Sequence, residues 1–203
     1  NVYNWKIQQE IYLLPENYST FEVGFSTFFL NRCNRSGILT KAGPIGGIEQ
    51  KGNYPIYARF NKKDLIERIN LIARYSNQIN IYNLDAVAFL DKIANELNVT
   101  SVLLYMDPPY YKKGKTLYLN FYQHQDHINI AEKLNETKNL KWIVSYDNVN
   151  EIQNIYNQYR TATFDLNYSL QETKKGSELF VFSHEIHVPD FLYIGKRVFE
   201  MEF

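Results

Sequence analysis

The sequence is poor in cysteine and lacks any long apolar segment. Its 203 residues include one cysteine, Cys33, so no disulfide framework can form, and we expect a reducing, cytoplasmic setting. No run of about 18 apolar residues and no signal peptide occurs, so we expect no membrane partner. These absences are typical of a globular protein that works inside the cell.

An excess of charge of either sign is also missing. The 22 Lys and Arg residues balance 22 Asp and Glu residues, so the net charge gives no argument for a nucleic-acid partner, which would need a local basic surface. Hydrophobic residues make up 45% of the chain, enough to bury a core. The length predicts one domain, or one domain with a small insertion.

The sequence also shows no motif for a catalytic nucleophile or for a metal site. No Ser-His-Asp order and no Cys-His pair indicates a catalytic nucleophile. His124 and His127 flank Asp126, but a third ligand is missing, and the start of a helix is the favoured interpretation. We therefore expect no metal site.

The most informative stretch runs from Ser101 to Tyr110. An apolar run of strand length ends at Asp107, which is followed by Pro108 and Pro109. Ligands of open α/β sheets bind outside the carboxyl ends of strands, so Asp107 lies where a site is expected. The prolines have a fixed φ and no N–H, and they keep the turn extended, which leaves main-chain oxygens available as acceptors.

This set of groups suits a planar ring that carries an amino group. The Asp107 carboxylate and a main-chain oxygen at the prolines can accept the hydrogens of an exocyclic amine. Tyr110 can stack on the ring, which contributes about 1–3 kcal/mol. The alternative is an ordinary Asp-Pro turn at a strand end. We favour the binding function because the motif directly follows a strand.

The amino-terminal part reads as two helices and a basic loop. Pro15 ends the first helix, and Gly37 is expected to stop a second helix that begins near Thr20. Five of the nine glycines lie between Gly37 and Gly52. Basic residues among glycines and side-chain amides suit contacts with phosphates and base edges, although a solvated loop explains them equally well. The basic residues of this region are Arg32, Arg35, Lys41, Lys51 and Arg59.

The remainder alternates between helices and strands. Asn61 is expected to cap a helix whose apolar stripe, from Leu65 to Ala73, faces a core. A strand at 79–84 ending at Asp85, a helix at 86–98 and a strand at 102–106 would form a parallel pair with a right-handed crossover. We expect a three-layer α/β sheet closed by an antiparallel hairpin. Its other predicted parts are a basic loop and apolar segment at 111–122, helices at 126–134 and 149–159, and strands at 142–145, 161–170 and 179–183, the last two flanking a loop at 172–176.

Three segments together resemble one known family. They are Asp107-Pro108-Pro109-Tyr110, the Phe29-Leu30-Asn31-Arg32 segment with the glycine-rich stretch after it, and Val144-Ser145-Tyr146-Asp147-Asn148. Between Tyr18 and Ser183 the chain is similar to the Dam-like, adenine-specific DNA methyltransferases. The resemblance implies an α/β, S-adenosylmethionine-dependent methyltransferase-like (Rossmann-like) sheet with a helical and loop DNA-recognition insertion. It also implies an amino-terminal helical segment (1–17), a target-recognition region (18–78), a catalytic core (79–188) and a carboxy-terminal tail (189–203).

The resemblance also implies roles for individual residues. The family transfers a methyl group from S-adenosylmethionine to the exocyclic amine of an adenine flipped out of double-stranded DNA. Asp107, Pro108, Pro109 and Tyr110 would form the catalytic motif. Asp85 and Asp107 would bind the cofactor. The implied DNA-binding residues are Asn31, Arg32, Arg35, Lys41, Lys51 and Lys112.

One motif of the family is missing. No Gly-x-Gly occurs in the sequence, although the family's cofactor-binding segment carries one. We therefore expect a fragment whose sheet lacks its first strand and which binds S-adenosylmethionine poorly. Two alternatives stay open, namely a catalytically inactive DNA-binding remnant and a methyltransferase of RNA or of protein glutamine. Asp107 at the first motif position and the basic insertion favour DNA over the second alternative.

Overall fold

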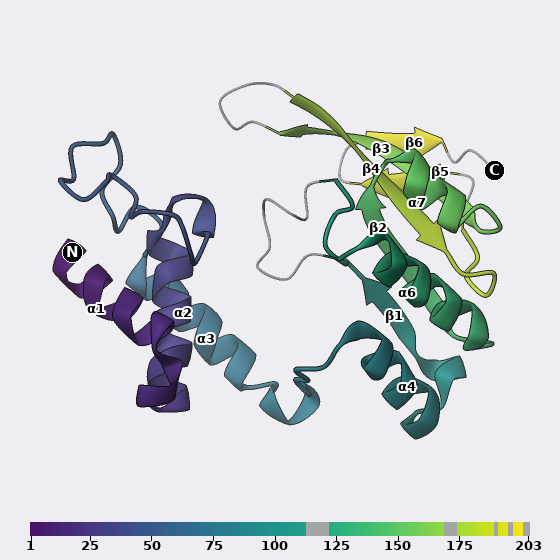
Figure 1. Cartoon of the computed structure of the whole chain (residues 1–203), viewed down its shortest axis with the longest axis horizontal. Coiled ribbons are helices and arrows are strands. Elements are labelled where there is room, and N and C mark those ends of the chain that lie inside the picture. Colours follow the sequence, from purple (N-terminus) through teal and green to yellow (C-terminus); the bar gives the residue numbers. More distant parts are fainter. Residues whose placement is uncertain (113–121, 169–173, 189–190, 195–196, 201–203) are drawn as a thin grey trace. The chain divides into compact units, whose positions relative to one another are not determined.

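The computed structural model describes residues 1–112, 122–168, 174–188, 191–194 and 197–200 (Figure 1). The chain divides into two compact units, Asn1–Ile81 and Tyr82–Phe203. The segments 1–17 and 18–78 of the sequence analysis both fall in the first unit. Most of the loop and apolar segment predicted at 111–122 lies outside the described residues, as does part of the loop predicted at 172–176.

Two helices open the first unit, as predicted. Helix α1 spans Val2–Leu13 and helix α2 spans Thr20–Cys33, with a 3₁₀ turn at Pro15–Asn17 between them. Both begin at caps that the sequence encodes. The Asn1 side chain accepts from the N–H of Asn4, and Ser19 forms a capping box with Glu22. Helix α2 ends at Cys33, earlier than the expected stop at Gly37, and Gly37 lies in a 3₁₀ turn instead.

A buried amide joins these helices to the loop that follows. Trp5 is buried with Leu30, and its indole Nε1 donates to Oδ1 of Asn34 over 2.6 Å. The Asn34 Nδ2 donates to the main-chain oxygens of Ile38, at 2.7 Å, and Leu39, at 3.4 Å. Asn34 thus satisfies both ends of its amide while it fixes the start of the loop against helix α1.

The glycine-rich loop is held by main-chain packing. Gly46 has a φ of +81°, and a Cβ there would lie 2.6 Å from the main-chain oxygen of Tyr54, so no other residue fits. The Gln50 amide donates to the oxygens of Ile45 and Gly47 and accepts from the N–H of Ile56. These bonds use the Gln50 amide inside the loop, where the sequence pattern suggested contacts with DNA bases.

Helix α3, Lys62–Ala73, forms where it is predicted but packs differently. None of its residues is buried, so the expected burial of its apolar stripe is wrong. Asn61 occupies the cap position, yet its amide donates to the Asp64 carboxylate instead of accepting from the helix. Residues 79–84 form no strand, and Ile81 is 90% exposed. A segment without a neighbouring strand leaves its N–H and C=O groups to water, so the alternating pattern of 79–84 did not suffice to predict a strand.

The second unit is built on a four-stranded sheet in the order β1-β2-β4-β3. Strands β1 and β2 are parallel, whereas β4 is antiparallel to both β2 and β3, which confirms the predicted hairpin. The crossover predicted from 79–84 to β1 is absent. The strands are β1 (Leu103–Met106), β2 (Lys141–Asp147), β3 (Arg160–Tyr168), β4 (Lys174–Phe182) and a separate hairpin of β5 (Phe191–Ile194) with β6 (Arg197–Glu200).

Helices α4 (Ala86–Glu96), α6 (His124–Glu136) and α7 (Asn150–Ile155) cover one face of this sheet (Figure 1). Their apolar residues enclose Trp142, Val144 and Tyr146 of β2. The other face carries a small cluster around Phe182 and Val188. The described part of the unit therefore has one helical layer and not the two of a three-layer sheet. None of the described helices is long and apolar enough to cross a membrane.

Candidate active site

The pleat of β1 places Asp107 at the end of the sheet. Leu104 and Met106 point towards the helical core, whereas Leu103 and Tyr105 lie on the opposite face and are exposed. Side chains alternate along a strand, so Asp107 continues the face of Tyr105 just beyond the last strand residue. Pro108 is buried, which fixes the turn that follows.

The neighbouring strand β2 contacts Asp107 through Ser145. The Ser145 Oγ lies 2.9 Å from Oδ1 of Asp107 and 2.9 Å from the hydroxyl of Tyr105. Ser145 is 3% exposed. The parallel register of β1 and β2, in which Met106 pairs with Val144, brings Ser145 beside Asp107.

Strand β2 also holds the segment after the motif. Asp147 ends β2, and its two carboxylate oxygens accept from the main-chain N–H groups of Tyr111, at 2.8 Å, and Lys112, at 3.0 Å. The Tyr110 hydroxyl donates to Oε1 of Glu178 on β4 over 2.7 Å. Three consecutive residues after the prolines are therefore fixed by two carboxylates of the sheet.

An aromatic cluster supports Tyr111 from the side of helix α6. The Tyr111 hydroxyl lies 3.0 Å from Nδ1 of His124, and the Tyr111 ring centroid lies 5.2 Å from that of His127. His127 is buried, and its Nδ1 lies 3.0 Å from the Tyr146 hydroxyl. Burial lowers the pKa of His127, and the carboxylates of Asp126 and Asp147 oppose that effect only in part. The imidazole is therefore favoured in its neutral form. No group of three His, Cys, Asp or Glu side chains among the described residues could hold a metal ion.

Two neighbouring cavities open beside the motif. The first, of about 270 Å³, has Asp107, Pro108 and Pro109 on one side and the start of helix α4 on the other. The second, of about 240 Å³, is lined by polar residues that include Asp85, Asp126 and Asn129. Both cavities are lined by Ala86 and Tyr122, so they adjoin. Burial raises the pKa of the Tyr122 hydroxyl, and the carboxylates of Asp85 and Asp126 add to the rise.

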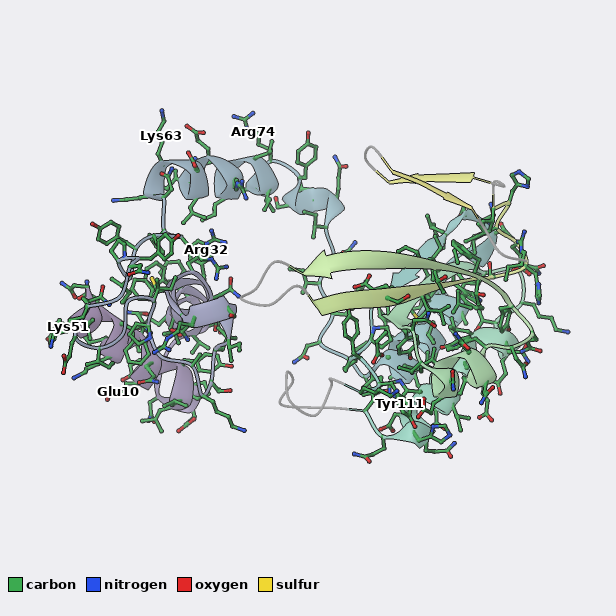
Figure 2. The ribbon with its side chains drawn as sticks, turned by 90° about the horizontal axis from the view of Figure 1, so that it is seen from above. Glu10, Arg32, Lys51, Lys63, Arg74 and Tyr111 are labelled. Carbon is green, nitrogen blue, oxygen red and sulfur yellow. The ribbon has the colours of Figure 1, made fainter. Side chains whose placement is uncertain are left out.

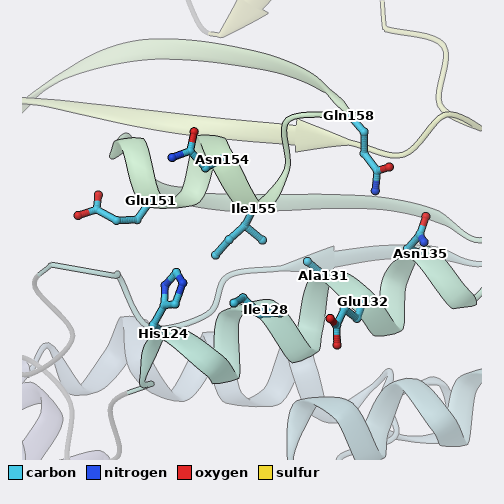
Figure 3. A pocket seen from close by; sticks show the side chains of 9 residues that line it. All are labelled: His124, Ile128, Ala131, Glu132, Asn135, Glu151, Asn154, Ile155 and Gln158. Atoms are coloured by element: carbon cyan, nitrogen blue, oxygen red, sulfur yellow. The ribbon is translucent and has the colours of Figure 1, made fainter.

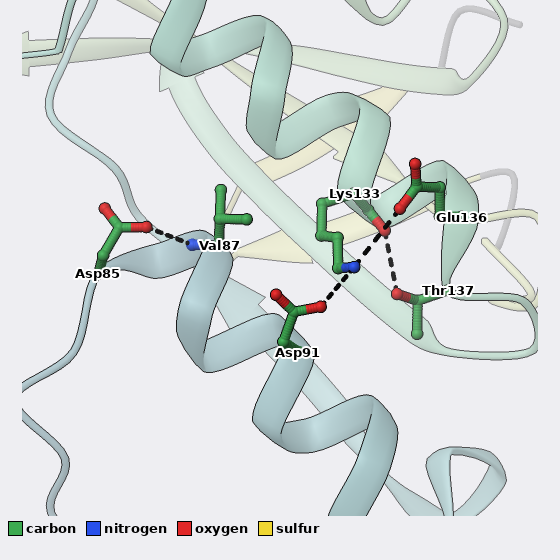
Figure 4. Close-up of polar contacts among 6 residues, drawn as sticks. All are labelled: Asp85, Val87, Asp91, Lys133, Glu136 and Thr137. Atoms are coloured by element: carbon green, nitrogen blue, oxygen red, sulfur yellow. Dashed lines mark hydrogen bonds and ion pairs between the residues drawn. The ribbon is translucent and has the colours of Figure 1, made fainter.

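Asp85 lies beside the site for a different reason from the one expected. The predicted position at the end of a strand is wrong, because 79–84 form none. Asp85 instead caps helix α4, and its Oδ1 accepts from the N–H of Val87 over 2.9 Å (Figure 4). Figure 4 also shows Lys133 of α6 bridging to Asp91 of α4, which fastens together the two helices that border the second cavity. An Asp directly before an apolar helix is a cap signal that the sequence already carried.

A larger cavity of the second unit is separate from the motif. It is a groove of about 480 Å³ between helices α6 and α7, floored by Ile128, Ala131 and Ile155 (Figure 3). It shares no lining residue with the cavities beside Asp107. Size alone therefore does not identify the site in this unit.

The residues expected to contact DNA differ in whether their side chains already form hydrogen bonds or ion pairs within the protein. The Asn31 amide donates to the oxygen of Gly37, and Nε of Arg32 donates to the oxygen of Arg59 over 2.9 Å. Arg32 and Lys51 are labelled in Figure 2, and Lys51 is paired with Glu49. Arg35 and Lys41 are exposed. Lys112 belongs to the second unit, directly after the motif, and its side chain is exposed.

Sequence reasoning missed three residues of this site, namely Ser145, Asp147 and Glu178. The signal for the first two was present, since polar residues at the end of a strand beside the motif strand are expected to meet the motif. The role of Glu178 depends on the pairing of β2 with β4, which periodicity does not reveal.

One comparison with known proteins finds a match. The family model of the D12 class N6 adenine-specific DNA methyltransferases matches residues 17–170, about three quarters of the chain. The matched segment includes the glycine-rich loop, the motif and strand β2. A search of the curated proteins finds no match.

Proposed function

Because the chain belongs to the D12 class of N6 adenine-specific DNA methyltransferases, we propose that Asp107 and the main-chain oxygen of Pro108 accept hydrogen bonds from the N6 amine of the target adenine. The protein is an enzyme of adenine methylation in DNA, and its family generally uses S-adenosylmethionine. The observation that carries the proposed roles is the position of Asp107 at the end of β1, beside a cavity and with one carboxylate oxygen bonded to Ser145.

Two acceptors at this position address the difficulty of the reaction. The lone pair of an aromatic amine is delocalised into the ring, which makes the nitrogen a weak nucleophile. Acceptors at Asp107 and Pro108 would favour a pyramidal nitrogen and hold it in line with the methyl group. S-adenosylmethionine, when bound, supplies a methyl group already activated on a sulfonium. The residues of the chain therefore contribute mainly by positioning the amine.

The adjoining cavities are the proposed binding site for one side of the cofactor. The cavity of Asp85, Asp126 and Asn129 offers acceptors for hydroxyl and amino groups, and its carboxylates suit a cationic ligand. The cavity of Asp107 is mainly apolar, which suits a reacting centre from which the bound ligands exclude water. We therefore assign Asp85 and Asp107 to the cofactor side of the site.

Tyr110 is the proposed stacking partner of the target base. Its hydroxyl is held by Glu178, which limits rotation of the ring and presents a fixed face. The N6 amine of a paired adenine cannot reach Asp107, so the substrate is double-stranded DNA from which the adenine is flipped. The cost of unstacking, a few kcal/mol, would be offset in part by stacking on Tyr110.

We keep 18–78, within the first unit, as the proposed recognition region, with 1–17 as an amino-terminal helical segment, 79–188 as the catalytic core and 189–203 as a tail. Asn31, Arg32 and Lys51 already bind partners within the unit, so their DNA contacts would use their remaining donors. We assign phosphate or base-edge contacts first to the exposed Arg35 and Lys41, and a phosphate contact near the flipped base to Lys112. DNA as the substrate and a thiol in place of disulfides fit a cytoplasmic enzyme.

Transfer of a labelled methyl group to double-stranded DNA tests these roles. The assay uses millimolar S-adenosylmethionine, the upper end of common KM values, because we expect weak binding. Asp107→Ala should lower turnover by at least about 100-fold while the fold is kept, since removing one preorganised polar group at a reacting centre has effects of this size. Glu132→Ala, in the separate groove, is the matched control and should retain activity.

Three outcomes separate the alternatives. N6-methyladenine formed by the parent and by Glu132→Ala, and lost in Asp107→Ala, supports the assignment. Near-normal turnover of Asp107→Ala contradicts it. A parent chain that binds DNA but forms no N6-methyladenine at any cofactor concentration is the inactive DNA-binding remnant.

A further inference from the structure

The buried Ser145 side chain forms its hydrogen-bond contacts with groups in the motif strand β1 or directly after it. Its Oγ lies 2.9 Å from Asp107 Oδ1, 2.9 Å from the Tyr105 hydroxyl and 3.5 Å from the main-chain oxygen of Met106. Tyr105 and Asp107 share one face of β1, and the parallel register places Ser145 against both. Three hydroxyl or carboxylate groups from two strands thus meet at one point.

The direction of these hydrogen bonds follows from the chemistry of the groups. An ionised carboxylate can only accept, so the single proton of the Ser145 hydroxyl is directed at Asp107. The contact with Met106 is too long to compete for that proton. The Ser145 oxygen then accepts from Tyr105, which must be the donor of the remaining bond. The result is a directed chain from Tyr105 through Ser145 to Oδ1 of Asp107.

This chain leaves one carboxylate oxygen for the substrate. Asp107 is exposed, and its Oδ2 accepts no hydrogen bond from any described residue. Without Ser145, both torsions of an exposed aspartate are free to vary, and the oxygen that should meet the amine is no longer fixed. Packing on this face of β2 does not require a hydroxyl at Ser145. Ile143, two residues earlier on the same face, is apolar and packs on the cluster of Phe182.

We propose that Ser145 is a positioning residue, oriented by Tyr105, that holds Asp107 with Oδ1 bound and Oδ2 directed at the adenine amine. The proposal rests on the proposed role of Asp107 as the acceptor of that amine. Ser145 acts through Asp107 and not on the substrate. Its removal should therefore affect the rate of the bound complex more than the binding of DNA or cofactor.

Three variants of the full chain test this role. Ser145→Ala removes the hydroxyl, Ser145→Thr retains it, and Tyr105→Phe removes the donor that orients it. Ser183→Ala is the matched control, because Ser183 is equally buried but bonds to the N–H of Trp142 at the opposite end of β2. Two readouts are compared, namely kcat and KM for methyl transfer, and the ¹³Cγ resonance of Asp107, identified by its loss in Asp107→Asn.

The expected pattern is specific. Ser145→Ala should lower kcat about tenfold with KM values for DNA and cofactor unchanged, which corresponds to the lower end of the range for one hydrogen bond to a charged group. Tyr105→Phe should lower kcat about two- to tenfold, as for a neutral bond. Ser145→Thr should restore the parent rate, and Ser183→Ala should retain it. The Asp107 resonance should move in Ser145→Ala and stay in Ser145→Thr.

Two results would overturn the proposal. An Asp107 resonance that is unchanged in Ser145→Ala would show that the hydrogen bond is not formed. A shifted resonance with an unchanged kcat would show that the bond exists but does not position the reacting group. If the parent transfers no methyl group, the proposed function fails, and the resonance still decides whether Ser145 holds Asp107.

Discussion

The carboxylate of Asp147 should control the order of the segment directly after the motif. It accepts from the N–H groups of Tyr111 and Lys112 with one oxygen each, at 2.8 and 3.0 Å. In Asp147→Asn the side-chain amide keeps one acceptor oxygen and directs a donor at the other main-chain N–H. One hydrogen bond is lost, and two donors face each other in its place.

The size of the effect follows from the charge of the acceptor. A hydrogen bond to a charged group contributes about 1.5–3 kcal/mol, and every 1.4 kcal/mol is a factor of about ten in an equilibrium. Local opening of this segment should therefore become about 10- to 100-fold more frequent in Asp147→Asn. The bonds are local to the motif, so we expect little change in the global free energy of unfolding.

Amide hydrogen exchange measures this opening directly. The N–H groups of Tyr111 and Lys112 should exchange about 10- to 100-fold faster in Asp147→Asn than in the parent. Asp91→Asn is the control, because Asp91 pairs with the Lys133 side chain and contacts no amide of the motif. Unchanged exchange at both amides would refute the reasoning, since it would mean that the segment keeps its order without Asp147.

Three further predictions concern DNA binding, pH and the cofactor. Arg35→Ala and Lys41→Ala should each reduce the slope of log K against log salt for DNA binding by about one. Lys6→Ala, on helix α1, is the control and should leave the slope unchanged. Equal slopes in all variants would show that the loop does not bind phosphates. Because burial lowers the pKa of His127 below its ordinary 6.5, the unfolded chain takes up a proton first as the pH falls, so the free energy of unfolding should decrease as the pH drops below about 6.5. Urea titrations should show a smaller acid loss in His127→Gln, and an equal loss would assign the effect to other groups. Calorimetric titration with S-adenosylmethionine should detect weak binding or none. The reason is that the sequence has no Gly-x-Gly turn and that Asp85 and Asp107 line only one side of the site. Micromolar affinity would mean that the pocket is complete.

The sequence was sufficient for those parts of the fold that local signals determine. The motif strand, the start of helix α2 near Thr20 and the β3–β4 hairpin all follow from apolar runs, helical spacing and turns. The position of Asp107 at a strand end also follows, because an apolar run that stops at Asp-Pro-Pro has few other arrangements.

The errors arose where a partner element decides the outcome. Alternation of Ile79 and Ile81 with polar residues is typical of a strand, but no described strand pairs with them. The apolar stripe of helix α3 predicted burial, yet no described element covers it. The helix predicted at 86–98 ends at Glu96, so Leu97 lies beyond it and is exposed. The sequence places Ser145 and Asp147 near a strand end, but which motif atoms they contact depends on the register between strands, which a single sequence does not specify.

The bond pattern of Asn34 bears on how sequence preference can diverge within such an enzyme. Its amide holds the loop by the main-chain oxygens of residues 38 and 39, so the path of the chain does not depend on which side chains are exposed there. Ile38 can then be exchanged without loss of the scaffold, whereas a change at Asn34 or Trp5 would remove the bonds that hold the start of the loop. Under the proposed recognition role, exposed positions of the loop are open to selection for new target sites, while two buried residues preserve the path of its first residues.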